Sequence, residues 1–76
     1  MIELKVPDVG EVDSIQLVKW HKKKGESFES GDEICDLVTD KAAFSLEAPQ
    51  KGTILETLIE EKKTVNVGDV VARVRI

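Results

Sequence analysis

The chain has 76 residues and a formal net charge of −4 at pH 7, with 15 acidic residues against 11 basic ones. This length allows one small domain, residues 1–76, with a modest core. The acidic balance excludes an electrostatic attraction to nucleic acid or to an anionic membrane, and no apolar run is long enough to span a bilayer.

In the first half, apolar and β-branched residues that alternate with polar ones predict four strands. These strands are Ile2–Val6, Ile15–Trp20, Ser27–Phe28 and Glu33–Thr39. The first two are separated by an acidic loop that includes Asp8, Val9, Gly10, Glu11, Val12 and Asp13. Gly25 and Gly31 are interpreted as turn residues between the later strands.

At the centre of the chain, the stretch Thr39-Asp40-Lys41-Ala42 interrupts two β-like runs, and the second run is Ala43–Ala48. Two strands with such a short interruption predict a hairpin with Lys41 at its tip. A tight hairpin usually has Gly in its second central position, which needs positive φ, and Lys41 would occupy that position here. An exposed turn lysine is usually a plain surface residue, so the rest of the chain must decide whether this one is displayed for modification.

The second half repeats the first. Ile2–Pro7 is echoed by Phe44–Pro49, with Gly10 and Gly52 three residues after each proline. Gly31-Asp32 is echoed by Gly68-Asp69 at an offset five residues shorter, and we assign the extra residues to the Asp8–Ser14 loop, because loops absorb insertions at little cost. Two matched halves, with turn signals at short intervals and no helical periodicity, predict eight strands.

The predicted fold is all-β: a flattened barrel or sandwich of two four-stranded antiparallel sheets related by a quasi-twofold axis. The hairpin at Lys41 would join the halves at one end, and both termini would lie at the other. We expect Gly25, Gly31, Gly52 and Gly68 to be structural turn residues. The predicted core is Ile2, Leu4, Val6, Ile15, Leu17, Phe28, Ile34, Cys35, Leu37, Phe44, Leu46, Ile54, Leu58, Val65, Val71, Ala72, Val74 and Ile76.

No set of residues suggests catalysis. His21 is the only histidine and follows a strand at the start of a lysine-rich turn, far in sequence from the only cysteine, Cys35. One histidine and one cysteine are too few for a usual zinc site, so we expect no metal. Cys35 lies in an apolar run and is interpreted as a buried structural thiol in a reducing compartment. The carboxylates are scattered and the glycines isolated, which leaves a binding or carrier module.

The run Val38-Thr39-Asp40-Lys41-Ala42, the glycines Gly25 and Gly52 on either side of it and the two-half repeat resemble the lipoyl domains of 2-oxo acid dehydrogenase complexes. The resemblance covers the whole chain. It implies that Lys41 carries lipoic acid in amide linkage, with Asp40 and Ala42 holding the turn and read by the lipoate-attaching enzyme.

The same resemblance implies a swinging-arm carrier, not an enzyme in itself. The arm would accept an acyl group from a thiamine-dependent decarboxylase, pass it to coenzyme A on an acyltransferase core and be reoxidised by dihydrolipoamide dehydrogenase. The Asp8–Ser14 loop would lie beside the arm and help to recognise the decarboxylase. The isolated domain is expected to be monomeric and cytoplasmic, or in the mitochondrial matrix if a leader has been removed.

The chain departs from the family pattern at two positions. Many lipoyl domains have Glu three residues before the lysine, a residue associated with recognition by the lipoylating enzyme, and this chain has Val38. The glycine expected opposite Gly25 in the second half is Lys62, so we expect that loop to turn as a wider one without glycine.

There are three alternatives to a lipoyl domain: a biotinyl carrier domain, an unmodified structural domain and the lipoylated carrier protein of glycine cleavage. A biotinyl carrier domain shares this fold and the hairpin lysine, but biotin acceptors have Met on both sides of the lysine, where this chain has Asp40 and Ala42. An unmodified structural domain of the same shape is the second, although such domains usually lack the tip lysine. The lipoylated carrier protein of glycine cleavage is longer and has additional helices.

Overall fold

The computed structural model describes residues 1–76, which form eight β-strands and no helix, so no segment could cross a membrane as a helix. The strands are β1 (Ile2–Lys5), β2 (Ile15–Trp20), β3 (Ser27–Phe28), β4 (Glu33–Thr39), β5 (Ala43–Glu47), β6 (Gly52–Thr57), β7 (Lys63–Val65) and β8 (Val70–Arg75). The expected number of strands is confirmed, and the boundaries of the first four differ from the expectation by one residue at most.

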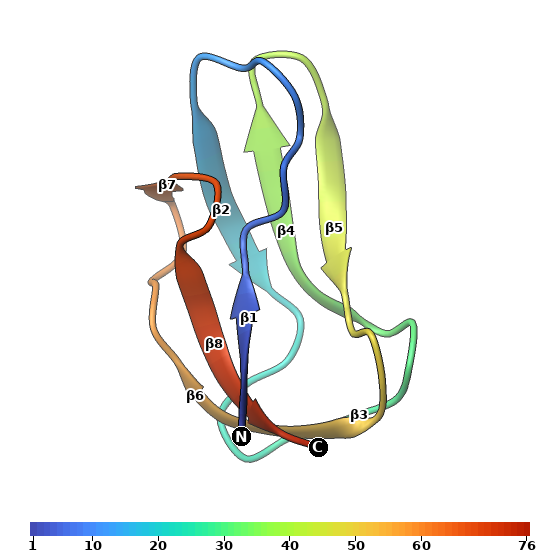
Figure 1. The fold of residues 1–76 in the computed structure, drawn as a ribbon. Coiled ribbons are helices and arrows are strands. Elements are labelled where there is room, and N and C mark those ends of the chain that lie inside the picture. The colour runs from blue at the N-terminus through green and yellow to red at the C-terminus, as the bar shows by residue number, and fades with distance from the viewer.

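The strands form two four-stranded antiparallel sheets, one in the order β1-β8-β6-β3 and the other in the order β5-β4-β2-β7. Figure 1 shows the hairpin between β4 and β5 at the top of the molecule and both termini at the bottom. The molecule is elongated, with principal extents of 32 × 20 × 18 Å. The predicted fold class and the separation of the hairpin from the termini are therefore confirmed.

The internal repeat is visible in the pairing of the strands. When each strand is replaced by its counterpart four strands away, one sheet becomes the other in the same order. The irregularities in register also correspond: the shift between Leu17 and Lys19 in β2 recurs between Ile54 and Glu56 in β6. Equivalent half-chains thus build equivalent sheets, with the core between them.

The repeated Gly-Asp turns are equivalent at the level of single hydrogen bonds. The Asp32 carboxylate accepts a hydrogen bond from the Glu29 backbone N–H at 2.9 Å, and the Asp69 carboxylate accepts one from the Asn66 N–H at 2.8 Å. The glycine before each aspartate has positive φ, 87° at Gly31 and 88° at Gly68. Each turn is therefore closed by the aspartate side chain, with glycine supplying the left-handed backbone.

Two expectations about turns are wrong. Gly52 is not a turn residue: it begins β6 without positive φ, whereas its supposed counterpart Gly10 has a φ of 86° in the first loop. A Cβ atom at Gly52 would collide with the Arg75 carbonyl oxygen and lie 2.9 Å from the Phe28 ring, so close packing requires glycine there. The second correction concerns Lys62, which itself adopts a φ of 69°. The loop at 58–62 is one residue shorter than the loop at 21–26, not wider.

The core lies between the sheets and follows the predicted alternation with a few exceptions. The buried residues are Leu4, Val6, Ile15, Leu17, Phe28, Ile34, Cys35, Leu37, Ala48, Ile54, Val65, Val71, Ala72 and Val74. Phe44 and Leu46 are only partly buried against this core, and Ala48 belongs to it although we did not predict it. Ile2, Leu58 and Ile76 were expected in the core but are 38%, 41% and 48% exposed, because they lie at strand ends or in a loop that the opposite sheet does not cover.

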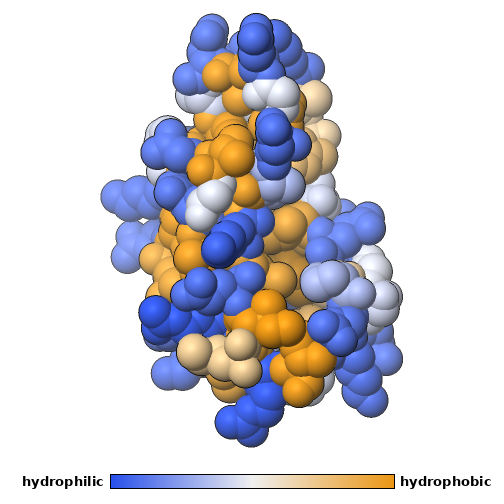
Figure 2. All heavy atoms as spheres, viewed as in Figure 1, coloured by the Kyte–Doolittle hydropathy of each residue, from blue (hydrophilic) through white to orange (hydrophobic).

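The surface differs between the two ends. Figure 2 shows that the end with the β4–β5 hairpin is covered mainly by hydrophilic residues, whereas apolar residues are exposed at the end with the termini. Met1, Ile2 and Ile76 account for half of the large apolar residues that are exposed. On the face shown, the end that presents Lys41 is thus the more polar one.

Candidate functional site

Lys41 lies at the tip of the hairpin between β4 and β5, at the end of the molecule opposite the termini (Figure 1). Asp40, Lys41 and Ala42 are all exposed. Of the two strands that carry the tip, β4 pairs with both β2 and β5 and contributes the buried residues Ile34, Cys35 and Leu37, whereas β5 is the edge strand of the sheet. The lysine is therefore displayed at the end of a strand that is anchored in the core.

Thr39 organises the turn. Its hydroxyl oxygen accepts hydrogen bonds from the backbone N–H groups of Lys41 at 3.1 Å and Ala42 at 3.0 Å, and its own N–H donates to the Ala42 carbonyl at 2.8 Å. Such a threonine turn satisfies the tip through a side chain. Lys41 does not have positive φ, so the expectation that it replaces a turn glycine is wrong: the hydroxyl makes the turn possible without one.

The Asp8–Ser14 loop lies beside the tip, as expected. The ammonium group of Lys41 donates a hydrogen bond to the Glu11 carbonyl at 2.8 Å, and the N–H of Asp13 donates one to the Asp40 carboxylate at 3.0 Å. These two contacts join segments that are about thirty residues apart in sequence. The loop and the hairpin thus form one surface around the lysine.

The loop has its own internal structure. The Asp8 carboxylate accepts a hydrogen bond from the Gly10 N–H at 2.9 Å, and Gly10 has the positive φ that this turn needs. Val9 and Val12 are partly buried against the core, which leaves Asp8, Glu11 and Asp13 exposed. Acidic groups therefore face the solvent next to Lys41 while two valines anchor the loop.

Val38 occupies the position three residues before the lysine and is 36% exposed near the end of β4. It lines a shallow hollow of about 320 Å³ on the solvent-facing side of the sheet, together with Val18, Ala43 and Phe44. Val38 thus places an apolar side chain on the surface near the tip, where a glutamate would place a negative charge.

The thiol of Cys35 does not contribute reactivity to the site. It is fully buried in β4, and burial, together with the negative charge of Asp36, raises its pKa to about 12. The thiol therefore stays protonated and unreactive at neutral pH, in agreement with a structural role.

Sequence reasoning missed one group of residues. It treated His21 as isolated, yet the imidazole Nε2 lies 2.8 Å from the Asp36 carboxylate, which also accepts a hydrogen bond from Ser45. The three residues lie just after β2, in β4 and in β5, so only the strand pairing brings them together. The relevant signal is the register of β2 against β4, which contains a bulge between Leu17 and Lys19 and is therefore not given by alternation alone.

At this site, an exposed lysine amine is presented at the tip of a hairpin, beside the exposed carboxylates of Asp40 and the acidic loop. Such a geometry suits covalent attachment of a group to the amine and presentation of that group to other proteins.

Comparison with known proteins identifies the family to which the chain belongs. Residues 2–74 match the family model described as "Biotin-requiring enzyme". The dihydrolipoyllysine-residue acetyltransferase components of the pyruvate dehydrogenase complexes of Staphylococcus aureus (strain Mu50) and Staphylococcus epidermidis (strain ATCC 12228) are each 33% identical over 73 residues. Each match covers 95% of this chain but 17% of the relative, so the chain spans a small part of the length of these proteins.

A solved structure matches the whole chain. The solution structure of the lipoyl domain of the 2-oxoglutarate dehydrogenase complex from Azotobacter vinelandii superposes with a TM-score of 0.82 at 30% sequence identity. The match covers 100% of this chain and 98% of that domain.

Proposed function

The chain belongs to the family of biotinyl and lipoyl attachment domains, as a lipoyl-type carrier domain and not a catalytic one, and from this premise we propose that Lys41 is covalently lipoylated. The observation that carries the proposal is the position of Lys41: exposed on a turn held by Thr39, at the end of the molecule farthest from the termini.

The surroundings of Lys41 fit the attached group. Nζ makes a single hydrogen bond, to the Glu11 carbonyl, and an amide nitrogen at the same position keeps one N–H with which to donate. Attachment forms the amide bond between Nζ and the lipoyl carbonyl, with loss of the leaving group of an activated lipoyl donor and of the positive charge of the lysine. Thr39 and Asp40 hold the backbone of the turn by contacts that do not involve Nζ, so the turn persists after modification.

When bound, the lipoyl group supplies a disulfide that accepts an acyl group together with two electrons. The residues of this chain present that group: the hairpin sets the point from which the arm extends, and the compact domain moves as one unit. Tethered motion raises the effective concentration of the carried group at each active site without new contacts.

We propose further that residues 1–76 form one carrier domain of the acyltransferase component of a 2-oxo acid dehydrogenase complex. The supporting observation is that two relatives at 33% identity are such components. Its partners are then a lipoate-attaching enzyme, a thiamine-dependent decarboxylase, the acyltransferase core and dihydrolipoamide dehydrogenase, in the cytoplasm or, after removal of a leader, in the mitochondrial matrix. The domain itself is a monomer in this proposal.

The test is the intact mass of the chain after expression in cells supplied with lipoate. A lipoyl increment is expected in the natural chain and in the control Lys51→Arg, which alters another exposed turn lysine, and is expected to be absent in Lys41→Arg. A biotinyl increment would instead assign the chain to the biotin carriers, for which the flanks Asp40 and Ala42 offer no support. No increment with either attaching enzyme would overturn the proposal.

A further inference from the structure

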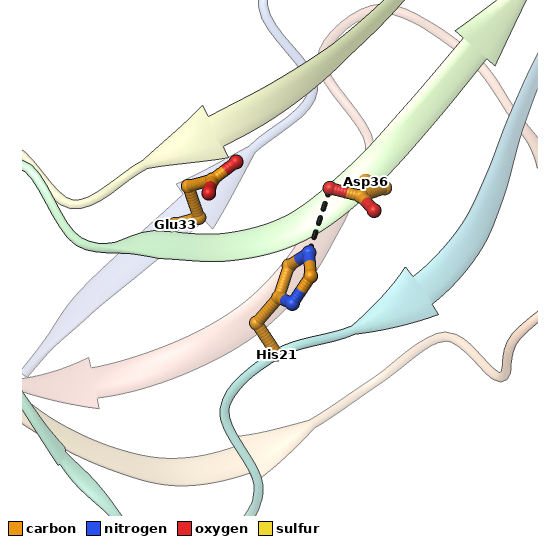
Figure 3. Close-up of side chains that lie close together, drawn as sticks. All are labelled: His21, Glu33 and Asp36. Atoms are coloured by element: carbon orange, nitrogen blue, oxygen red, sulfur yellow. Dashed lines mark hydrogen bonds and ion pairs between the residues drawn. The ribbon is translucent and has the colours of Figure 1, made fainter.

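A second cluster of side chains lies away from the lysine, on the solvent-facing side of the β5-β4-β2-β7 sheet. We call it the His21 cluster: His21, Glu33, Asp36 and Ser45, which come from three adjacent strands or their ends. Figure 3 shows His21, Glu33 and Asp36 near one another, with the imidazole directed at the Asp36 carboxylate. The register explains the grouping, because Asp36 lies opposite both Lys19 of β2 and Ser45 of β5.

The contacts in this cluster are short. The His21 Nε2 atom lies 2.8 Å from Asp36 Oδ1, and the Ser45 hydroxyl oxygen lies 2.7 Å from the same oxygen and 2.5 Å from Glu33 Oε2. A serine hydroxyl has one hydrogen and can donate it to only one acceptor. Ser45 can therefore donate to only one of the two carboxylate oxygens that lie close to its hydroxyl.

Three potential metal-ligand atoms lie close together in the cluster. One ligand atom from each of His21, Glu33 and Asp36 lies within 4.8 Å of the other two. A zinc ion with bonds of about 2.0–2.2 Å in tetrahedral geometry requires its ligand atoms to be about 3.4 Å apart, a spacing that small rotations of exposed side chains can reach. Three protein ligands leave a fourth position open to water, as at many zinc sites.

The surroundings are compatible with an ion. The cluster lines the hollow of about 320 Å³ that Val18, Val38, Ala43 and Phe44 close on the apolar side, so there is space for a metal-bound water. The imidazole selects a transition ion over magnesium or calcium, which prefer ligand sets made only of oxygen. Cys35 is buried on the other side of β4 and does not belong to the ligand set.

We propose that His21, Glu33 and Asp36 form a Zn²⁺-binding site, with the Ser45 hydroxyl as a neighbour that donates a hydrogen bond to one of the two carboxylates. The site is independent of the proposed lipoylation. Its two carboxylate ligands lie in β4 and its imidazole ligand directly follows β2, so a bound ion would cross-link the end of β2 to β4.

The test is a calorimetric titration of the metal-free chain with zinc chloride. Lys41→Arg is used as the parent, because it keeps any attached dithiol from binding the ion. One saturable site per chain is expected, with binding weakened more than about tenfold by His21→Asn and by Glu33→Gln. The control Glu60→Gln removes the same charge from an exposed loop and should bind zinc like the parent, and magnesium chloride should give no saturable heat.

A second measurement guards against misfolding of a variant. Zinc should change the backbone amide NMR shifts of the parent near positions 21, 33, 36 and 45, and should raise its midpoint of thermal unfolding, because an ion that binds only the folded chain stabilises it. The same amides should not respond in His21→Asn. Absence of saturable binding in the parent, or equal affinity in His21→Asn, would show that the cluster is a hydrogen-bonded network only and would overturn the proposal.

Discussion

Gly25 and Lys62 occupy the same backbone position in the two halves of the molecule. The Gly25 N–H donates to the Ile54 carbonyl at 2.8 Å, and the Lys62 N–H donates to the Leu17 carbonyl at 2.6 Å, so each turn is attached to the equivalent strand of the other half. Both residues have positive φ, 88° at Gly25 and 69° at Lys62. The fold imposes this conformation even where the residue disfavours it.

The strain at Lys62 predicts a stabilising substitution. A residue with a side chain is disfavoured by about 1–2 kcal/mol in the left-handed region, and substitution by glycine removes this cost. Part of the gain is offset because glycine has more conformational freedom in the unfolded chain. Lys62→Gly should therefore raise the free energy of unfolding by about 0.5–1 kcal/mol, measured by urea denaturation. Lys63→Gly, in β7 and without positive φ, is the control and should be destabilising. A loss of stability in Lys62→Gly would contradict this interpretation.

Gly52 predicts an effect of the opposite sign. A methyl group there would meet the Arg75 carbonyl oxygen and the Phe28 ring at the start of β6, where backbone must move to make room. Gly52→Ala should lower the free energy of unfolding by about 2 kcal/mol or more, as in other overpacked sites. Thr57→Ala, exposed at the far end of the same strand, should change it by less than about 0.5 kcal/mol. Similar unfolding midpoints for the two variants would exclude the predicted collision.

The Asp36 carboxylate predicts a pH dependence. Hydrogen bonds, first from the Ser45 hydroxyl and then from His21, hold the pKa of Asp36 below its ordinary value of 3.8. A group whose pKa is lower in the folded chain stabilises the fold above its unfolded pKa, and this stabilisation is lost as the pH falls through the folded pKa. The natural chain should therefore lose stability below about pH 4, and Asp36→Asn should lose less over the same range.

The measurement for Asp36 is urea denaturation at a series of pH values from 2 to 6. Ser45→Ala should fall between the natural chain and Asp36→Asn, because it removes the larger of the two causes and leaves His21 in place. Parallel pH profiles for all three chains would mean that the hydrogen bonds do not discriminate between the charge states of Asp36.

The proposed role of the acidic loop predicts that its replacement slows acyl transfer by the decarboxylase without affecting lipoylation of Lys41. If the Asp8–Ser14 loop is read by the decarboxylase, its replacement by a short neutral turn should leave lipoylation of Lys41 intact, because Thr39 holds the hairpin turn independently. Reductive acylation by the decarboxylase of the same organism should become slower, mainly through a higher KM for the domain. Replacement of Gln50-Lys51 by two serines alters the equivalent, shorter connection and is the matched control. Equal acylation rates in both chains would exclude the loop as a recognition element.

The fold could be predicted from the sequence because the two halves of the chain repeat the same order of strands and turns. Alternation located the strands of the first half, and the repeat implied those of the second. The change in offset between the halves showed that the first half has extra residues, and their assignment to the Asp8–Ser14 loop is confirmed, because the structure has the longer connection there. The errors have physical reasons. Gly10 and Gly52 look equivalent in the sequence repeat. Glycine suits position 10 because the backbone there has positive φ, and it is required at position 52 because a Cβ atom would collide with neighbouring atoms. The sequence alone does not distinguish these two reasons for a glycine.

The site was predictable in part. The exposed tip and the adjacent loop follow from strand order, whereas the hydroxyl of Thr39 as the organiser of the turn depends on side-chain geometry that no spacing reports. The proximity of His21 to Asp36 depends on a register that contains a bulge, and a simple alternation pattern gives no indication of bulges.

The exchange of the two sheets by the repeat also relates Lys41 to the termini. The connection from β4 to β5 corresponds to the gap between the end of β8 and the start of β1, which pair through Ile2 and Val74. The strand order therefore has two equivalent connections: the β4–β5 hairpin, which carries the lysine, and the position between β8 and β1, where the two chain termini lie. A circular permutant that joins 76 to 1 through a short linker with a central lysine, and opens between 40 and 41, would exchange the roles of the two connections and present the amine from the opposite pole.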